Sequence, residues 1–102
     1  MQTLRIVSPV TTSALSPTSA TPIALPAGSG NGVILHNPIA GSRVALTLSG
    51  PDESAPATVD GSNQLFVLAA GASLALDLTD NVRIFAQCDV AGGQVNAALA
   101  GG

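Results

Sequence analysis

The chain has 102 residues, of which 46% are hydrophobic although only 2% are aromatic and 9% charged. This length fits one domain with a modest aliphatic core, and a charged fraction far below the about 25% of ordinary soluble domains favours a protein that associates with others. The formal net charge is −3, and the only cations are Arg5, Arg43 and Arg83. They are too few and too scattered for the basic patch that nucleic-acid binding needs, so we expect no nucleic-acid partner.

Neither a membrane span nor a disulfide is expected. Gly, Pro, Ser or Asp interrupts every apolar run before it reaches the ~18 residues of a membrane span. Pro9 and Pro17 break the N-terminal stretch where a signal peptide would need its apolar core. Cys88 is the only cysteine, which excludes an intrachain disulfide.

The N-terminal part predicts short strands around an irregular stretch. Residues 3–8 alternate as a first strand, which Pro9 ends or confines to a sheet edge. Residues 10–21 are rich in Ser, Thr and Pro, so we expect an extended arm or a loop with little to bury. A short strand is expected at 23–25, before a glycine-rich turn at 28–32.

The middle of the chain predicts two longer strands. Residues 33–37 are apolar on both faces and then polar, which is typical of a central sandwich strand. Residues 43–49 alternate cleanly and predict a strand with one buried face. The adjacent acidic pair within 50–54 marks the most exposed loop, and 60–63 is a turn.

The stretch 65–87 is interpreted as a β-meander, with three strand-like runs separated by two turns. Leucines at every second position mark a buried face over 74–78. In the run 82–87 Phe85 lies on the side opposite the other apolar residues, so both sides should be partly covered. Gly71 can take the positive φ that the first turn needs.

Residues 88–96 are interpreted as a glycine hairpin. About eight short strands at regular spacing, frequent turns and no helical period predict an all-β protein, an antiparallel sandwich or jelly roll formed as one domain over 1–102. A small β-barrel is the alternative. The predicted core consists of Val33, Leu35, Val44, Leu46, Leu48, Leu74, Leu76, Leu78, Val82 and Ile84.

Residues capable of catalysis are few, and we expect neither enzymatic activity nor a cofactor. His36, the only histidine, would need a partner such as Cys88 or Asp77, and a strand-end role beside the Asn-Pro turn is favoured. The glycines at 28–32 could suggest a phosphate loop, but a strand follows where that chemistry needs a helix. A hairpin loop is therefore expected.

Two groups of oxygen ligands could attract a hard cation. They are Asp52, Glu53 and Asp60 around one loop, and Asp77, Asp80 and Asn81 at one turn. Neither has calcium-loop spacing, so solvated turn residues are expected and no metal site is predicted.

The partner-binding surface is expected on the N-terminal segment 1–21, which includes the arm, together with the acidic loop 52–54. The arm has too little apolar periodicity to be held by its own core, and an extended segment can pair with the strand edge of a partner. The predicted partner-binding residues are Val10, Thr11, Thr12, Ser13, Asp52, Glu53 and Ser54.

The segments GVILHNP at 32–38, LAAGASLALDL at 68–78 and VRIFA at 82–86 resemble a recurring small β domain of tailed-bacteriophage virion proteins. The resemblance covers most of the chain as a pattern of strands and turns. The usual pattern carries aromatics near the turns, whereas this chain has only Phe66 and Phe85, which counts against binding of host-surface sugars.

The resemblance implies a capsid decoration or cement protein that binds and stabilises the outer shell. The alternative is a tail, baseplate or head-fibre component with a receptor- or ligand-binding role. The implied partners are the major capsid protein and further copies of the chain, as a trimer rather than a dimer. The implied location is the capsid exterior, after synthesis in the host cytoplasm.

Overall fold

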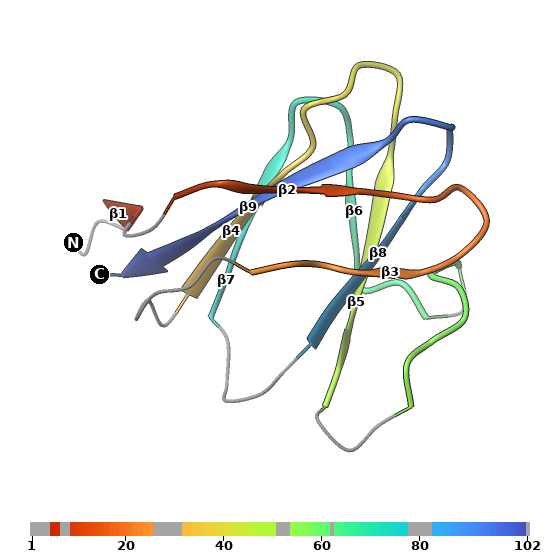
Figure 1. Cartoon of the computed structure of the whole chain (residues 1–102), viewed down its shortest axis with the longest axis horizontal. Helices are drawn as coiled ribbons and strands as arrows, with labels where there is room; N and C mark the ends of the chain where they lie inside the picture. Colours follow the sequence, from red (N-terminus) through yellow and green to blue (C-terminus); the bar gives the residue numbers. More distant parts are fainter. Residues whose placement is uncertain are drawn as a thin grey trace.

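The computed structural model describes residues 5–6, 9–25, 32–50, 54–61, 63–77 and 83–101. These residues form nine β-strands and no helix (Figure 1), which confirms the all-β prediction. The strands are β1 (Arg5–Ile6), β2 (Thr11–Ala14), β3 (Thr21–Pro22), β4 (Gly32–His36), β5 (Val44–Ser49), β6 (Phe66–Leu68), β7 (Ser73–Asp77), β8 (Arg83–Cys88) and β9 (Gln94–Gly101).

The strands are arranged in two antiparallel sheets. Sheet A has the order β2-β9-β4-β7, with β1 pairing the C-terminal part of β9. Sheet B has the order β3-β8-β5-β6. The chain crosses from one sheet to the other at every connection from β2 to β9 except that between β5 and β6. This order is that of a jelly roll, so the predicted antiparallel sandwich is confirmed.

The N-terminal segment is part of this framework. β2 pairs with β9 from Thr11 opposite Ala97 to Ala14 opposite Gln94, and β3 pairs with β8. The prediction of an arm over 10–21 is therefore wrong for β2, because backbone pairing holds a segment whose side chains have little apolar periodicity. The loop alternative fits the residues between β2 and β3.

The predicted meander is wrong in its pairing, although its three strands exist. β6 pairs with β5, β7 with β4, and β8 with both β5 and β3, so consecutive strands lie in different sheets. The predicted hairpin over 88–96 is likewise a crossover from β8 to β9. Side-chain alternation identifies which face of a strand is buried but not which strand lies beside it.

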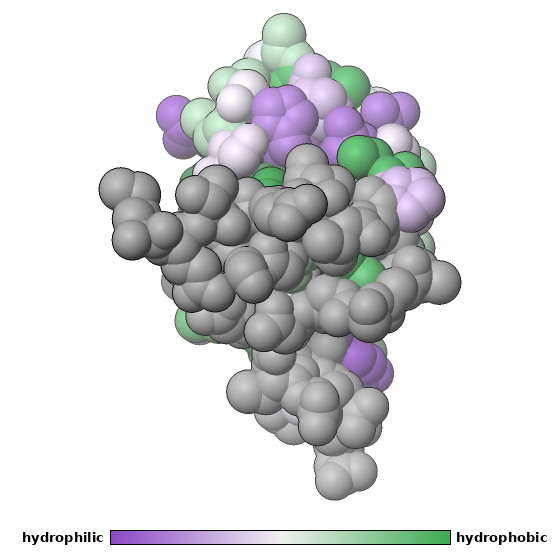
Figure 2. All heavy atoms as spheres, turned by 90° about the vertical axis from the view of Figure 1, so that its left-hand side faces the viewer, coloured by the Kyte–Doolittle hydropathy of each residue, from purple (hydrophilic) through white to green (hydrophobic). Residues whose placement is uncertain are grey.

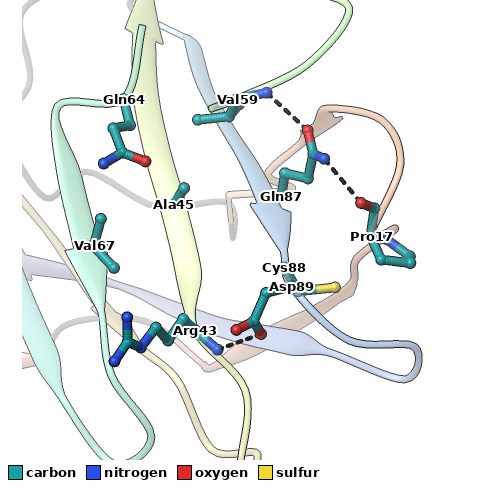
Figure 3. A pocket seen from close by; sticks show the side chains of 9 residues that line it. All are labelled: Pro17, Arg43, Ala45, Val59, Gln64, Val67, Gln87, Cys88 and Asp89. Carbon is teal, nitrogen blue, oxygen red and sulfur yellow. Dashed lines mark hydrogen bonds between the residues drawn. The ribbon is translucent and has the colours of Figure 1, made fainter. Parts of the chain in front are cut away.

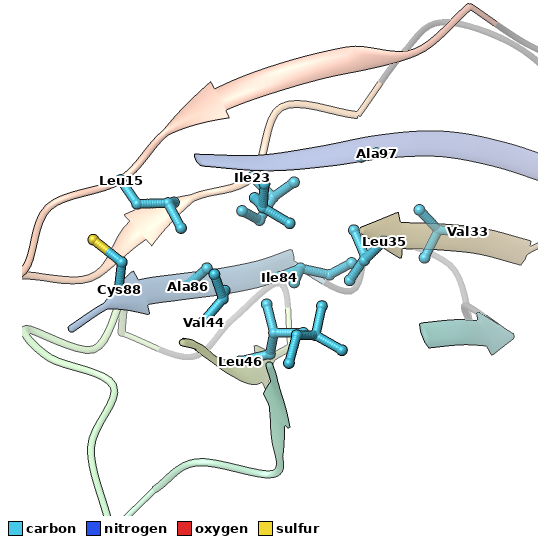
Figure 4. Packing of buried hydrophobic residues seen from close by; sticks show 12 residues of the cluster. Leu15, Ile23, Val33, Leu35, Val44, Leu46, Ile84, Ala86, Cys88 and Ala97 are labelled. Atoms are coloured by element: carbon cyan, nitrogen blue, oxygen red, sulfur yellow. The ribbon is translucent and has the colours of Figure 1, made fainter. Parts of the chain in front are cut away.

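The core lies between the two sheets (Figure 4). The predicted residues Val33, Leu35, Val44, Leu46 and Ile84 are buried, whereas Leu48, Leu74 and Leu76 are only partly buried. Leu74 and Leu76 face the core, but β7 is an edge strand that has one neighbour among the described strands. Leu78 and Val82 lie outside the described residues. The core also includes Leu15, from the segment 10–21 expected to bury little, and Ile23, from the short strand predicted at 23–25.

Asn37 has a structural role that its turn-forming tendency did not predict. It is fully buried, and its Nδ2 donates hydrogen bonds to the carbonyls of Ser42 at 2.8 Å and Leu68 at 3.1 Å. Its Oδ1 accepts the Ile39 N–H at 3.2 Å. One side chain thereby joins the turn after β4 to the end of β6, in the other sheet.

Candidate functional site

The predicted partner-binding residues in and just before β2 divide into two kinds. Val10 is 57% exposed, and Thr12 is exposed with its Oγ1 donating to Asn96 Oδ1 at 2.8 Å. Thr11 and Ser13 instead tie β2 to the segment after β3. The Thr11 hydroxyl donates to the Ala24 carbonyl at 2.8 Å, and the buried Ser13 Oγ accepts the Ala24 N–H at 3.2 Å.

Ser54 is the part of the acidic loop that falls within the described residues. Asp52 and Glu53 lie outside the described residues, and Ser54 is exposed. The connection that carries Ser54 leaves the end of β5 at the bottom of Figure 1, whereas β2 crosses the upper part of the molecule. The structure therefore does not bring β2 and Ser54 into one surface.

Two neighbouring rows on the outer face of sheet A carry uncharged side chains. In one row Ile34 of β4 lies between Ala75 of β7 and Ala98 of β9. In the next, His36 lies between Ser73 and Asn96, with Thr12 of β2 beyond Asn96. Neither row contains Asp, Glu, Lys or Arg, so a partner could cover both without desolvating a permanent charge.

A shallow hollow of about 160 Å³ lies on this face. It is lined by Val10, Ile34, His36, Asn96, Ala97 and Ala98. Figure 2 views the end of the molecule at the left of Figure 1, where described hydrophobic and hydrophilic side chains are intermixed.

The outer face of sheet B is partly closed by the chain itself. Ile84, Ala86 and Cys88 of β8 face the core, so Phe85 and Gln87 face outward. Phe85 is nevertheless only 3% exposed, which confirms the prediction that both sides of this strand are covered. The Arg83 guanidinium carbon lies 5.3 Å from the centre of the Phe85 ring.

Gln87 holds two loops over this face (Figure 3). Its Oε1 accepts the Val59 N–H at 2.8 Å, and its Nε2 donates to the Pro17 carbonyl at 3.0 Å. The loops also bond each other, from the Ala20 N–H to the Ala57 carbonyl at 2.9 Å. Val59 is buried beneath its loop.

The rest of this face is an open cleft of about 420 Å³. Ala45 of β5 lies between Val67 of β6 and Gln87 of β8, and this small side chain between longer neighbours leaves a hollow. The cleft is lined by Pro17, Arg43, Ala45, Val59, Gln64, Val67, Gln87, Cys88 and Asp89. Its size is within the range of small-ligand sites.

Arg43 and Asp89 lie together at one end of the cleft. The Arg43 N–H donates to Asp89 Oδ1 at 2.8 Å, and the Asp89 N–H donates to the Arg43 carbonyl at 3.2 Å. The exposed Arg43 side chain extends below Val67 (Figure 3) and makes no hydrogen bond or ion pair with any described residue. The cleft thus combines an apolar floor with an available guanidinium.

The residues considered for catalysis are separated by the fold. His36 Nδ1 bonds Ser73 Oγ at 2.9 Å on the outer face of sheet A. Cys88 faces the core from sheet B, and its thiol donates to the Val90 carbonyl at 2.9 Å. Asp77 pairs with Gly32, at the opposite end of β4 from His36. The structure therefore brings neither partner to the histidine.

Metal and membrane features were also considered. Among the described residues no three His, Cys, Asp or Glu side chains are grouped to hold a metal ion. Asp60 lies in a turn, where its carboxylate accepts the Thr58 hydroxyl at 3.2 Å and its N–H donates to Asn63 Oδ1 at 2.9 Å. No helix in the described part of the chain is long and apolar enough to cross a membrane.

No protein-family model, curated protein or solved structure matches this chain. The two surfaces above therefore supply the functional argument. Sequence reasoning included Val10 and Thr12 of the first surface but missed the cleft, because only strand pairing places Ala45 between Val67 and Gln87.

Proposed function

We propose that this protein is a structural component of a tailed-phage virion, a capsid decoration or cement protein that binds and stabilises the outer shell. The observation that carries the proposal is the pair of uncharged rows through Ile34 and His36 on the outer face of sheet A. A β surface of this kind can be buried against another protein without the large cost of desolvating charges. The resemblance of three segments to virion β domains supports the assignment to a phage particle.

The proposed partners are the major capsid protein and further copies of the chain. The sparse surface charge supports self-association, since little repulsion opposes it, and the resemblance favours a trimer over a dimer. We propose the capsid exterior as the location, and neither nucleic acid nor membrane as a partner. Sedimentation that finds a stable monomer at micromolar concentration would contradict assembly before shell binding.

The direct test is the copy number of the protein in purified virions, measured by quantitative mass spectrometry. Several hundred copies per particle support decoration of the shell, whereas about a dozen or fewer, as expected for a single symmetric tail ring, contradict it.

The contact face is tested by binding to shells that lack the protein. Ala75→Glu places a charge on the exposed edge strand of the proposed face and is expected to abolish binding without unfolding the protein. Val90→Glu, at an exposed position between β8 and β9, is the matched control and should bind normally. Equal occupancy by both variants would exclude this face as the contact.

A tail, baseplate or head-fibre component with a ligand-binding role is the second candidate. The cleft beside Ala45 favours it, because an available guanidinium and an apolar floor are features of a recognition site. The copy-number measurement separates the two candidates.

A further inference from the structure

The cleft on sheet B adjoins a strand edge to which a partner can add. β6 is the last strand of its sheet, and no described strand pairs with its outer edge. Leu65 and Val67 are 58% and 48% exposed there. An open edge with exposed apolar side chains is a surface on which an extended segment can form a further strand, since the backbone groups along it are available for pairing.

The charge at the cleft selects the chemistry of that segment. The Arg43 guanidinium extends toward β6 and has no partner among the described residues. A planar guanidinium binds a carboxylate through two parallel hydrogen bonds. One arginine is too little for a polyphosphate chain, whose binding needs several cations. An acidic side chain fits this end of the cleft better.

The floor of the cleft specifies a second feature of the segment. Ala45 and Val67 form an apolar hollow, closed on the far side by Val59 and the two hydrogen bonds of Gln87. Residues two apart along a strand face the same side. An acidic residue and an apolar residue separated by one position can therefore reach Arg43 and the exposed Val67, at the rim of the hollow, together.

We propose that this cleft binds an extended acidic segment of a partner protein, added beside β6. The acidic side chain bonds the Arg43 guanidinium, and the apolar side chain two positions away packs on the exposed Val67, at the rim of the hollow. Gln64 and Asp89 also line the cleft. The proposal does not depend on the shell-binding role of sheet A.

The test is an NMR titration of the ¹⁵N-labelled full chain with two synthetic peptides. The probes are acetyl-Thr-Glu-Thr-Val-Thr-amide and the same peptide with Gln in place of Glu. The acidic peptide is expected to shift the amide resonances of Ala45, Gln64 and Val67. The Gln peptide should bind about fivefold more weakly, because it loses the charge-assisted pair.

Two variants and one control make the result specific. Arg43→Gln keeps the backbone bonds to Asp89 and should remove the difference between the peptides. Val67→Ser removes the apolar contact and should weaken both peptides about tenfold. Val90→Ser makes the same change at an exposed position between β8 and β9 and should alter neither. Amide shifts confined to other surfaces, equal affinity for the two peptides, or a preference that survives Arg43→Gln would each overturn the proposal, whatever the shell-binding assay finds.

Discussion

The two outer faces of the sandwich differ in how far the chain's own loops cover them. On sheet B an outward-facing aromatic residue, Phe85, is almost completely covered, and Gln87 bonds the loops that lie over that face. On sheet A the outward-facing residues around Ile34 are short and uncharged, and Ala75 remains exposed. Sheet B thus uses its own loops to bury apolar surface, whereas sheet A leaves a uniform face available to a partner.

Removing the N-terminal segment is the change expected to have the largest effect on stability. Deletion of residues 1–21 takes away β2, the buried Leu15, and the loop held by Gln87. We expect the shortened chain to lose cooperative unfolding, measured by circular dichroism in urea. An unchanged unfolding midpoint would instead restore the interpretation of this segment as an arm.

Truncating one outward-facing side chain to alanine on each sheet compares the two outer faces directly. Phe85→Ala should lower the free energy of unfolding by about 3–5 kcal/mol, because it leaves a cavity under the loops. Ile34→Ala is expected to cost only about 1 kcal/mol, since Ile34 is partly exposed. Urea unfolding of both variants checks the pair. Similar losses would mean that sheet A is covered as fully as sheet B.

The loop attachment on sheet B can be weakened at one residue. Gln87→Ala leaves the Val59 N–H and the Pro17 carbonyl without their partner. The expected loss of stability is about 1–2 kcal/mol, with faster hydrogen exchange at the Val59 amide. Gln87→Met keeps the side-chain length without the hydrogen bonds, so the Val59 amide should exchange as fast as in Gln87→Ala. Unchanged exchange in both variants would show that Gln87 does not hold the loop.

The smallest effect on stability is expected on the open face. Ala75→Glu should change the free energy of unfolding by less than about 0.5 kcal/mol, because the side chain is exposed on an edge strand. Thr47→Glu is the comparison on sheet B. Thr47 pairs with Phe85 and is only 7% exposed, so the carboxylate would be buried at a cost of several kcal/mol. If Ala75→Glu and Thr47→Glu lowered the free energy of unfolding by similarly small amounts, the two faces would not differ in how they are covered.

The sequence by itself determined the longer strands after residue 31 and most of the turns between them, but not β2. Alternation over 43–49 identified Val44 and Leu46 as inward-facing, and both are fully buried. Two turns marked by glycine contain residues with positive φ, Gly71 at 80° and Gly92 at 83°. These features are local, because a strand's period and a turn's backbone angles depend on residues that are neighbours in the chain.

Only the tertiary structure decided which strands are neighbours, and with that every candidate surface. Thr12 meets Asn96 across most of the chain length, and Ala45 lies between Val67 and Gln87 only because β5 pairs with both β6 and β8. Strand partners are selected by long-range pairing and shared burial, which side-chain alternation within one strand does not encode. For that reason the sequence predicted the sandwich, while the uncharged face of sheet A and the cleft of sheet B emerged from strand order and register.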